Sequence, residues 1–400
     1  MGFLVSRIVG QHPFFQHAER VRGVLLVSIV LLGLGNGFGQ SSFLWYFGNQ
    51  AGIKFNANGT TSPLTGSAMT TNEGSTVASD TSGVLMFYSD GVSVWNNSSS
   101  TPVATGLLGS QSSTQAALAL ALPGSNCQRF LVFTTKGLET SGAHDLGVVL
   151  VNVSGTSPGY LVNVNQPALS VVQPSGSVVF AEKLAATSDT AGGYWVVAHD
   201  YALGTGSATT FYKYNITAAG FGSVTTTAQA QSQLAAVQQT QSVGSNHHDN
   251  NAPSYNAQGQ MKFSKTGQKL GLVLAGSKIV DLYQFHLVTG NLTLLATTTV
   301  SSSLGNLYGC EFSPNGTKLY ASEGFAGSGT IIRKLYQWDI TAGTLGTPFV
   351  VASGSNVYSN RYKYNALQLG PNDKIYCSEE MGISFLSVIA NHNDSGAACN

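Results

Sequence analysis

A strand, a tight turn and a second strand occur three times in the C-terminal half of this chain. The copies read FSKTGQKLGLVL at 263–274, FSPNGTKLYASE at 312–323 and LGPNDKIYCSEE at 369–380. In each copy an apolar strand end is followed by Gly, Pro, Asn or Asp. Gly and Asn tolerate positive φ and Pro presets φ at the turn entry, so these residues reverse the chain easily. A hairpin repeated at intervals of roughly 40–60 residues indicates a chain built from similar β-sheet units.

A second phrase supports the same division. An aromatic strand ending at a Thr- and Gly-containing turn appears as TFYKYNITAAGFG (210–222), DLYQFHLVTGNLT (281–293) and KLYQWDITAGTLG (334–346). Strand–turn–strand patterns also occupy 76–96 and 116–135. The predicted units therefore begin near residues 73, 113, 181, 258, 309 and 365.

Six units of three or four short strands predict an all-β fold, a β-propeller. A seventh blade follows if the N-terminal segment FLWYFG (43–48) pairs with strands from the C-terminal end and closes the ring. The prediction is seven blades of four-stranded antiparallel sheets. The alternative is a two-sheet sandwich, but seven-stranded sandwiches run about 100 residues and lack self-similarity at this period.

Composition agrees with strands joined by turns. Only 9% of the 400 residues are charged, against about 25% in typical soluble domains. Gly is abundant at 47 residues, and 42% of the chain is apolar, which argues against disorder. Eighteen basic residues balance eighteen acidic ones. Without a basic excess, nucleic acid is not an expected partner.

The first residues resemble an export signal. The apolar run VLLVSIVLLGL (24–34) follows Arg20 and Arg22 and precedes small residues that end at Gly37 and Gly39. A run this short does not span a bilayer as a helix, which needs about 20 residues. We expect residues 1–39 to be a signal peptide and 40–400 to be the propeller domain, secreted or at the outer cell surface, with no membrane span after cleavage. A membrane anchor or a buried helix is the alternative.

Four cysteines are widely spaced along the chain, at Cys127, Cys310, Cys377 and Cys399. They show no metal-binding spacing. Four cysteines allow three disulfide connectivities, and the sequence does not choose among them. The alternative is that Cys310 and Cys377 are small apolar residues of strands.

In a propeller the first strand of each blade lines the central channel, so polar residues at its start are candidate ligand contacts. These positions are Glu73, Gln115, Lys183, Glu311 and Asn365. Lys183 is the only basic residue among them, and we expect Glu73 and Glu311 to lie across the ring from it. The alternative is structural: these side chains hydrogen-bond one another and hold the blades in register.

Histidines offer weaker candidates. SNHHDNN contains His247, His248 and Asp249, which could ligate one metal only from a loop, because neighbours on a strand point in opposite directions. His199 lies near the end of the predicted strand YWVVAHDY, without a nucleophile motif beside it, so inter-blade hydrogen bonding is the simpler role. No cofactor-binding motif is present, and none is expected.

Several motifs together resemble one family: the N-terminal propellers of large secreted Bacteroidetes proteins. Those proteins often carry PKD or immunoglobulin-like modules and a gliding-motility-associated sorting domain, and they leave by type IX secretion. The resemblance implies export through that machinery. The family often has Cys where Ser75 stands, which weakens the case for a disulfide at Cys399. The motifs are WYFGNQAGIKFN (45–56), GSAMTTNEGSTVASDTSGVLMFYSDGVSVWN (66–96), GLLGSQSSTQAAL (106–118), AEKLAAT (181–187), YWVVAHDY (194–201) and GAACN (396–400).

Two functions follow as hypotheses. The first is a non-catalytic binding, adhesion or structural module with WD-like repeats, which meets an extracellular glycan, peptide or matrix component. The second is a propeller enzyme of the lactonase or quinoprotein-dehydrogenase kind, with its site in the central channel. The sequence favours the module, because no convergent catalytic set is legible in it.

Overall fold

The structure is a computed structural model of the chain. Strands predominate, and helices are few and short in the part of the chain that is described. The described residues are 19–20, 43–80, 82–97, 99–141, 143–171, 179–201, 210–242, 255–301, 305–324, 332–355, 364–379 and 385–399.

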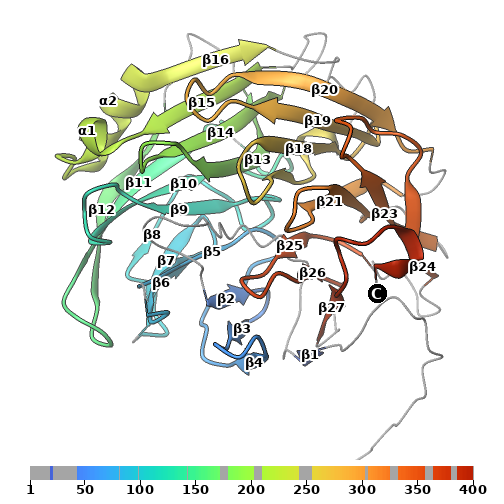
Figure 1. The fold of residues 1–400 in the computed structure, drawn as a ribbon. Helices are drawn as coiled ribbons and strands as arrows, with labels where there is room; N and C mark the ends of the chain where they lie inside the picture. Colours follow the sequence, from blue (N-terminus) through green and yellow to red (C-terminus); the bar gives the residue numbers. More distant parts are fainter. Residues whose placement is uncertain are drawn as a thin grey trace, which may run out of the picture.

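Seven antiparallel sheets are arranged around a central axis, as Figure 1 shows. The fold is therefore the all-β, seven-bladed propeller that the repeats predicted. Six sheets have four strands and one has three within the described ranges. The first strands of successive blades contact one another around the axis. These inner strands are β2 (Leu44–Phe47), β5 (Thr76–Ser79), β9 (Ala117–Ala121), β13 (Val179–Ser188), β17 (Met261–Phe263), β21 (Leu307–Phe312) and β25 (Leu367–Leu369).

Each blade continues outward from its inner strand in chain order, and blade 7 takes its last strand from the N-terminal region. In blades 1 to 3 the further strands are β3 (Ala51–Phe55) and β4 (Thr61–Leu64); β6 (Leu85–Ser89), β7 (Ser93–Asn96) and β8 (Ala104–Thr105); and β10 (Arg129–Thr134), β11 (Gly147–Ser154) and β12 (Leu161–Ser170). In blades 4 and 5 they are β14 (Tyr194–Tyr201), β15 (Thr210–Ile216) and β16 (Gln238–Ser242), and β18 (Lys269–Leu274), β19 (Ile279–Phe285) and β20 (Leu292–Thr299). In blades 6 and 7 they are β22 (Lys318–Glu323), β23 (Ile332–Asp339) and β24 (Phe349–Ser355), and β26 (Ile375–Cys377), β27 (Phe385–Ile389) and β1 (Glu19–Arg20).

The three repeated hairpins each join the first two strands of a blade, in blades 5, 6 and 7. Each turn contains one residue in the left-handed region: Gly267 at φ +72°, Gly316 at φ +67° and Asp373 at φ +59°. Gly adopts this conformation freely, and Asp is among the few other residues that tolerate it. The same backbone requirement explains why the motif recurs in the sequence.

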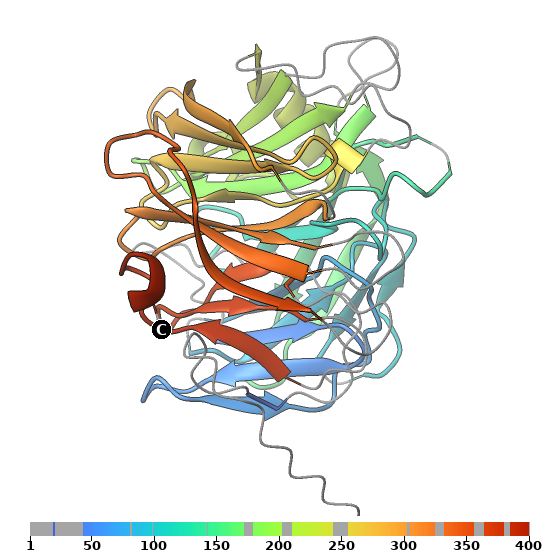
Figure 2. The ribbon, with the colours of Figure 1, turned by 90° about the vertical axis from the view of Figure 1, so that its right-hand side faces the viewer.

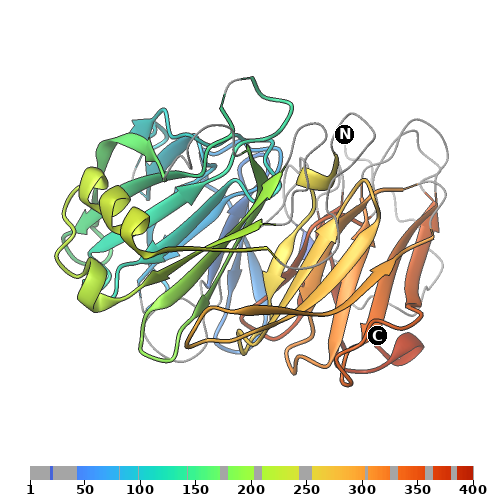
Figure 3. The ribbon, with the colours of Figure 1, turned by 90° about the horizontal axis from the view of Figure 1, so that it is seen from above.

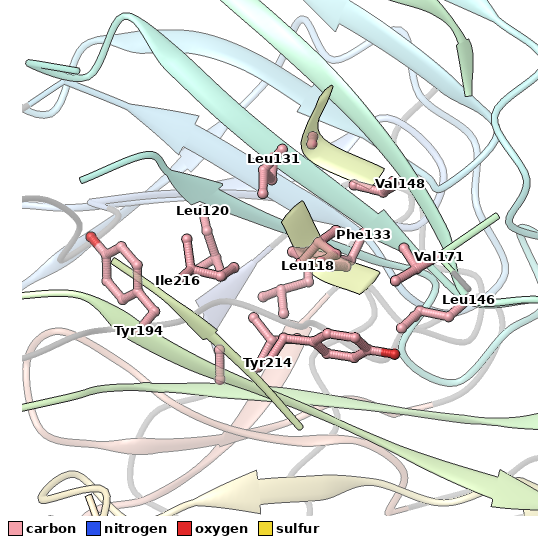
Figure 4. Close-up of a cluster of buried hydrophobic side chains, with 14 of the residues drawn as sticks. Leu118, Leu120, Leu131, Phe133, Leu146, Val148, Val171, Tyr194, Tyr214 and Ile216 are labelled. Atoms are coloured by element: carbon pink, nitrogen blue, oxygen red, sulfur yellow. The ribbon is translucent and has the colours of Figure 1, made fainter. Parts of the chain in front are cut away.

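The hydrophobic core lies between neighbouring sheets. Figure 4 shows one such cluster, in which Leu118 and Phe133 of blade 3 pack with Tyr214 and Ile216 of blade 4. Strands covered on both faces explain the continuous apolar runs of the sequence, such as ALALA at 117–121. The propeller thus has a series of inter-blade cores in place of one central core.

Two helices interrupt the strand pattern between β15 and β16: α1 (Ala218–Phe221) and α2 (Thr227–Val237). Figure 3 shows them at the left edge, outside the ring of strands. The Thr226 hydroxyl accepts from the Gln229 N–H and the Gln229 side chain bonds back, which forms a capping box. The helices pack on blade 3 from a loop of blade 4, so they join these two blades. None of the helices in the described ranges is long and apolar enough to cross a bilayer.

Ring closure differs from the prediction that the segment 43–48 pairs with the C-terminal strand. β2 pairs only with β3, and β27 pairs instead with β1, Glu19 opposite Leu386. The reason is the turn directly after β2, where Gly48 and Gln50 have positive φ and fold β3 back onto β2. The ring closes because the sheet of blade 1 packs against the sheet of blade 7. At this contact the Trp45 and Tyr376 rings meet edge to face, with 5.4 Å between their centroids. Figure 2 shows the blue first sheet directly beside the red last sheet.

The four cysteines are all free thiols in the structure. Cys310 lies on β21 and Cys377 on β26, both fully buried in inter-blade clusters. Their role as small apolar strand residues, one of the two interpretations of the sequence, agrees with this packing. Ser75, at the position where the resembled family often has Cys, donates a hydrogen bond to the Tyr46 carbonyl at 2.9 Å.

Candidate functional site

Glu73, Gln115 and Asn365 lie shortly before inner strands, as predicted. Lys183 lies in the middle of β13 and Glu311 near the end of β21, so neither stands at the start of its strand. Gln115, Lys183 and Asn365 are completely buried, Glu311 is nearly so, and Glu73 is half-buried. The five residues differ in the hydrogen bonds that their side-chain polar atoms make.

Gln115 connects three blades. Its Oε1 accepts from the main-chain N–H of Leu184 at 3.3 Å and of Met261 at 2.9 Å. Its Nε2 donates to the carbonyls of the same two residues, at 2.9 and 3.1 Å. A single carboxamide from blade 3 therefore satisfies both main-chain groups of one residue on blade 4 and one on blade 5.

Gln260 repeats half of this pattern two blades further round the ring. Its Oε1 accepts from the N–H of Cys310 on blade 6 and of Leu367 on blade 7, both at 3.0 Å. Sequence analysis did not single this residue out. The sequence could have identified Gln260, because this residue directly precedes the inner strand β17, much as Gln115 shortly precedes the inner strand β9.

Lys183 is bound by three successive carbonyls. Its Nζ donates to the carbonyl oxygens of Ala257 at 3.1 Å and Gly259 at 2.9 Å, and also to that of Gln258. Burial lowers the pKa of Lys183, and the Glu182 carboxylate opposes this effect. Three converging acceptors match the three N–H groups of an ammonium, so the geometry favours the charged form.

Glu182, which sequence analysis passed over, is the acidic neighbour of Lys183. One carboxyl oxygen accepts from the Thr114 N–H at 2.8 Å and the Thr114 hydroxyl at 2.7 Å; the other accepts from the Leu138 N–H at 3.0 Å. Burial raises the pKa of Glu182 to about 7, against these hydrogen bonds, and Glu139 raises it further. Glu182 thus ties β13 to the start of β9 and to the loop after β10.

Glu73 lies beside the same acids. Burial raises the pKa of Glu73 well above the usual carboxyl range; Glu182 and Glu139 raise it further, while a hydrogen bond from the Tyr308 hydroxyl lowers it. Tyr308 belongs to blade 6 and Glu73 precedes the inner strand of blade 2. The contact therefore crosses the ring.

Glu311 belongs to a second group. Its Oε1 accepts from the Phe312 N–H at 2.9 Å and its Oε2 from the Leu369 N–H at 2.8 Å. Burial raises the pKa of Glu311, while the neighbouring Lys262 ammonium lowers it. Lys262 itself donates to the Gln368 side chain. The expected arrangement of Lys183 opposite both Glu73 and Glu311 is not the one observed, because Lys183 interacts with Glu182 and Glu311 with Lys262.

The histidine candidates add no site to the described part of the chain. His199 on β14 is buried against Phe211, with ring centroids 4.7 Å apart. His247, His248 and Asp249 lie outside the described residues. Within the described ranges, no group of three His, Cys, Asp or Glu side chains is placed to hold a metal ion.

Comparison with known proteins assigns no family to the chain. No protein-family model matches the chain, and no curated protein matches it. Solved structures similar to it include a protein from Lactobacillus plantarum (12% identity, 93% of this chain and 99% of that one, TM-score 0.49). Another is the Cps50 (Swd1) β-propeller domain of Myceliophteria thermophila (11%, 89% and 99%, 0.47). A third is a candidate 6-phosphogluconolactonase from Bacteroides uniformis (12%, 82% and 83%, 0.46).

At such low identities these similarities assign no activity to the chain. It is a seven-bladed β-propeller whose inner strands are cross-linked by buried polar side chains.

Proposed function

We propose that this protein is an exported β-propeller that acts as a non-catalytic binding or adhesion module. One observation carries the proposal: the charged and amide side chains inside the ring bond to main-chain groups of other blades. The side chains of Gln115, Lys183 and Glu182 together make nine hydrogen bonds to main-chain groups and one to the Thr114 hydroxyl. Groups held this way stabilise the blade arrangement, and general acid–base or nucleophilic chemistry would require them to be released.

The outer surface supports a binding role. Exposed apolar side chains lie on the outermost strands, including Leu161 on β12, Leu295 on β20 and both Phe349 and Val350 on β24. Exposed apolar side chains on sheet edges are typical contact points for partners. We propose that the partner is an extracellular glycan, peptide or matrix component.

Export is part of the proposal. The apolar run at 24–34 and the small residues up to Gly39 support removal of residues 1–39, which leaves a propeller of 40–400. The motifs shared with secreted Bacteroidetes propellers support the outer surface or the medium as the destination, by type IX secretion. Removal would also take away β1, so blade 7 would keep three strands, as blade 1 has.

The test uses purified residues 40–400. Arrays of glycans and of matrix peptides should give saturable binding, whereas lactone, ester and quinone-linked alcohol oxidation assays should give no turnover above buffer. Metal analysis belongs to the same experiment, because a tightly held stoichiometric ion would favour the enzyme alternative.

A matched variant sharpens the result. Glu182→Gln removes the acidic neighbour of Lys183 without changing the side-chain shape. Any turnover that is present in the wild type and lost in this variant would overturn the proposal. Binding that persists in both would agree with it.

A further inference from the structure

Three side chains from three different blades meet inside the ring. Lys262 comes from β17 of blade 5, Glu311 from β21 of blade 6 and Gln368 from β25 of blade 7. These residues keep only 8%, 3% and 5% of their surface exposed, so water has little access to them. An amine, a carboxyl group and a carboxamide in such surroundings are the components of an amide-forming reaction.

The amine of Lys262 is in direct contact with the carboxamide of Gln368. Its Nζ donates a hydrogen bond to Gln368 Oε1, which places this nitrogen beside the carboxamide carbon, Cδ. The Nε2 group of the same carboxamide donates to the Leu369 carbonyl at 3.1 Å, which restrains the orientation of the amide. A nucleophile that two strands hold beside an electrophilic carbon avoids the entropy cost of a bimolecular encounter.

Glu311 supplies an acid–base group at the same place. Its Oε2 accepts from the Leu369 N–H at 2.8 Å, so the carboxyl lies at the residue that follows Gln368. Burial lowers the pKa of Lys262, and Glu311 opposes this effect; burial raises the pKa of Glu311, and Lys262 opposes it. Transfer of a proton from the ammonium to the carboxylate removes both buried charges. It leaves the neutral amine, which is the form that attacks a carbonyl carbon.

A second lysine–glutamine contact of the same chain lacks the acid. Lys213 on β15 donates to Gln241 Oε1 on β16 at 2.8 Å, and also to the Gly290 carbonyl at 2.8 Å. Burial lowers the pKa of Lys213, with no contribution from a carboxyl group of the described residues. The chain therefore contains its own control, a pair that has the contact without the carboxyl.

We propose that Lys262 and Gln368 form an intramolecular isopeptide bond, with Glu311 as the proton-transfer group. The Nζ–Cδ bond forms and the Cδ–Nε2 bond breaks. From the neutral amine, one proton passes through Glu311 to Nε2, which leaves as ammonia, so the reaction needs no oxidant or reductant and Glu311 ends unchanged. The product links blade 5 to blade 7 across blade 6. It is a single reaction of the chain with itself, so it goes beyond the binding function and does not depend on it.

Peptide mapping of the full chain by mass spectrometry tests the bond. Trypsin cleaves after unmodified lysine, so it should not cleave after Lys262 once this residue is acylated. The digest should contain a branched peptide that joins the segment around Lys262 to residues 364–374, which include Gln368. Its mass should be the sum of the two peptides less one ammonia. The branched peptide itself is the readout, because Asn–Gly steps such as Asn315–Gly316 also lose ammonia.

Two variants and the internal control assign the roles. Lys262→Arg keeps a donor toward Gln368 but cannot attack, since the guanidinium stays protonated, and it should give no branched peptide. Glu311→Gln keeps the side-chain shape and both reacting groups. Its linked fraction should fall at least tenfold at equal times, because general acid–base catalysis typically contributes about 10²–10⁴-fold. Lys213 and Gln241 should be recovered in separate peptides from every sample.

Far-UV circular dichroism checks that both variants keep the wild-type fold, and detection of the bond in the wild type depends on neither of them. The proposal is overturned if the wild type yields Lys262 and Gln368 only in separate peptides, or if the link forms equally in Glu311→Gln. A Lys213–Gln241 link of the same extent would also overturn it, because contact alone would then be sufficient.

Discussion

Each inner strand of the ring has one edge that no other strand of its blade covers. Main-chain N–H groups on that edge, such as those of Leu184 and Leu367, are buried and need acceptors. Side chains of other blades supply them, Gln115 for Leu184 and Gln260 for Leu367. At the residue scale, buried polar side chains therefore make the hydrogen bonds that another strand would make if one lay along the inner edge of each blade.

The first prediction concerns Gln115. Gln115→Leu leaves two N–H groups and two carbonyls without their partner, and each buried unsatisfied group costs about 1–3 kcal/mol. The free energy of unfolding should fall by about 3 kcal/mol or more in denaturant titrations. Gln239→Leu, at an exposed position of β16, should change it by less than about 0.5 kcal/mol. Equal stability of the two variants would contradict the role given to Gln115.

The second prediction concerns pH. The pKa of Glu182 is raised from 4.5 to about 7 in the folded protein. A carboxyl whose folded pKa lies above its unfolded one stabilises the fold at low pH, and that stability is lost as the pH rises from about 4.5 to about 7. The loss should reach about 3 kcal/mol. Glu139, Glu73 and Lys183 are the titratable groups beside it.

Denaturant titrations at pH 5 and pH 8 measure this effect. Glu182→Gln should be less stable than the wild type at pH 5, because an amide cannot accept from both Thr114 and Leu138 as the carboxyl does. The variant should also lack the decline between the two pH values that Glu182 causes. A wild-type decline that survives unchanged in Glu182→Gln would show that other groups are responsible.

Sequence patterns located these positions only in part. The search for polar residues at the starts of inner strands identified Gln115 and Asn365, which precede β9 and β25, and Lys183, which lies within β13. Alternation along the strand does not separate Glu182 from Lys183, because β13 is covered on both faces and both side chains are buried. The pairing of β13 with β14 also shifts register between Phe180 and Leu184. Such an irregularity depends on how two strands pair, which a single strand's sequence does not show.

At the scale of elements, the hairpins were the part of the fold most accessible to sequence reasoning, because a left-handed turn residue restricts residue choice so strongly. One position of the chain allows the free-energy cost of a side chain at a left-handed turn residue to be measured without steric effects. At Gly316 the backbone has φ +67° and a Cβ would meet nothing within 4 Å, so any cost of a side chain there is a backbone cost.

Gly316→Ala should therefore lower the free energy of unfolding by about 1–2 kcal/mol. Gly346→Ala is the matched control, since a Cβ there also meets open space and φ is not positive. It should leave stability unchanged or raise it slightly, because alanine restricts the unfolded chain. Thermal unfolding of the two variants side by side provides the comparison, and an equal loss in both would contradict the account of the turn.

At the scale of the whole molecule, the ring closes through packing of blade 1 on blade 7. The sequence indicated that the N-terminal and C-terminal blades meet. It did not show that β2 pairs with β3 alone, because this pairing depends on the turn at Gly48 and Gln50, whose positive φ values are known only from the structure. β1 contributes only two paired residues to closure.

Cleavage after Gly39 should consequently cost little stability. Residues 40–400 should unfold within about 1–2 kcal/mol of the full chain, given the modest worth of two cross-strand pairs. Mass spectrometry of protein secreted by its host should find an N-terminus near residue 40. A mature N-terminus upstream of the apolar run would contradict the domain assignment, and a large loss of stability would show that β1 matters to closure.

The central claim is that buried side chains satisfy the inner edges of the ring. Hydrogen exchange at single-amide resolution tests it most directly, on the amides of Leu184, Met261, Cys310 and Leu367. They should exchange as slowly as amides in the middle of a sheet, and Gln115→Leu should accelerate Leu184 and Met261 while leaving Cys310 and Leu367 slow. Rapid exchange of all four in the wild type, or no response to the substitution, would contradict the claim.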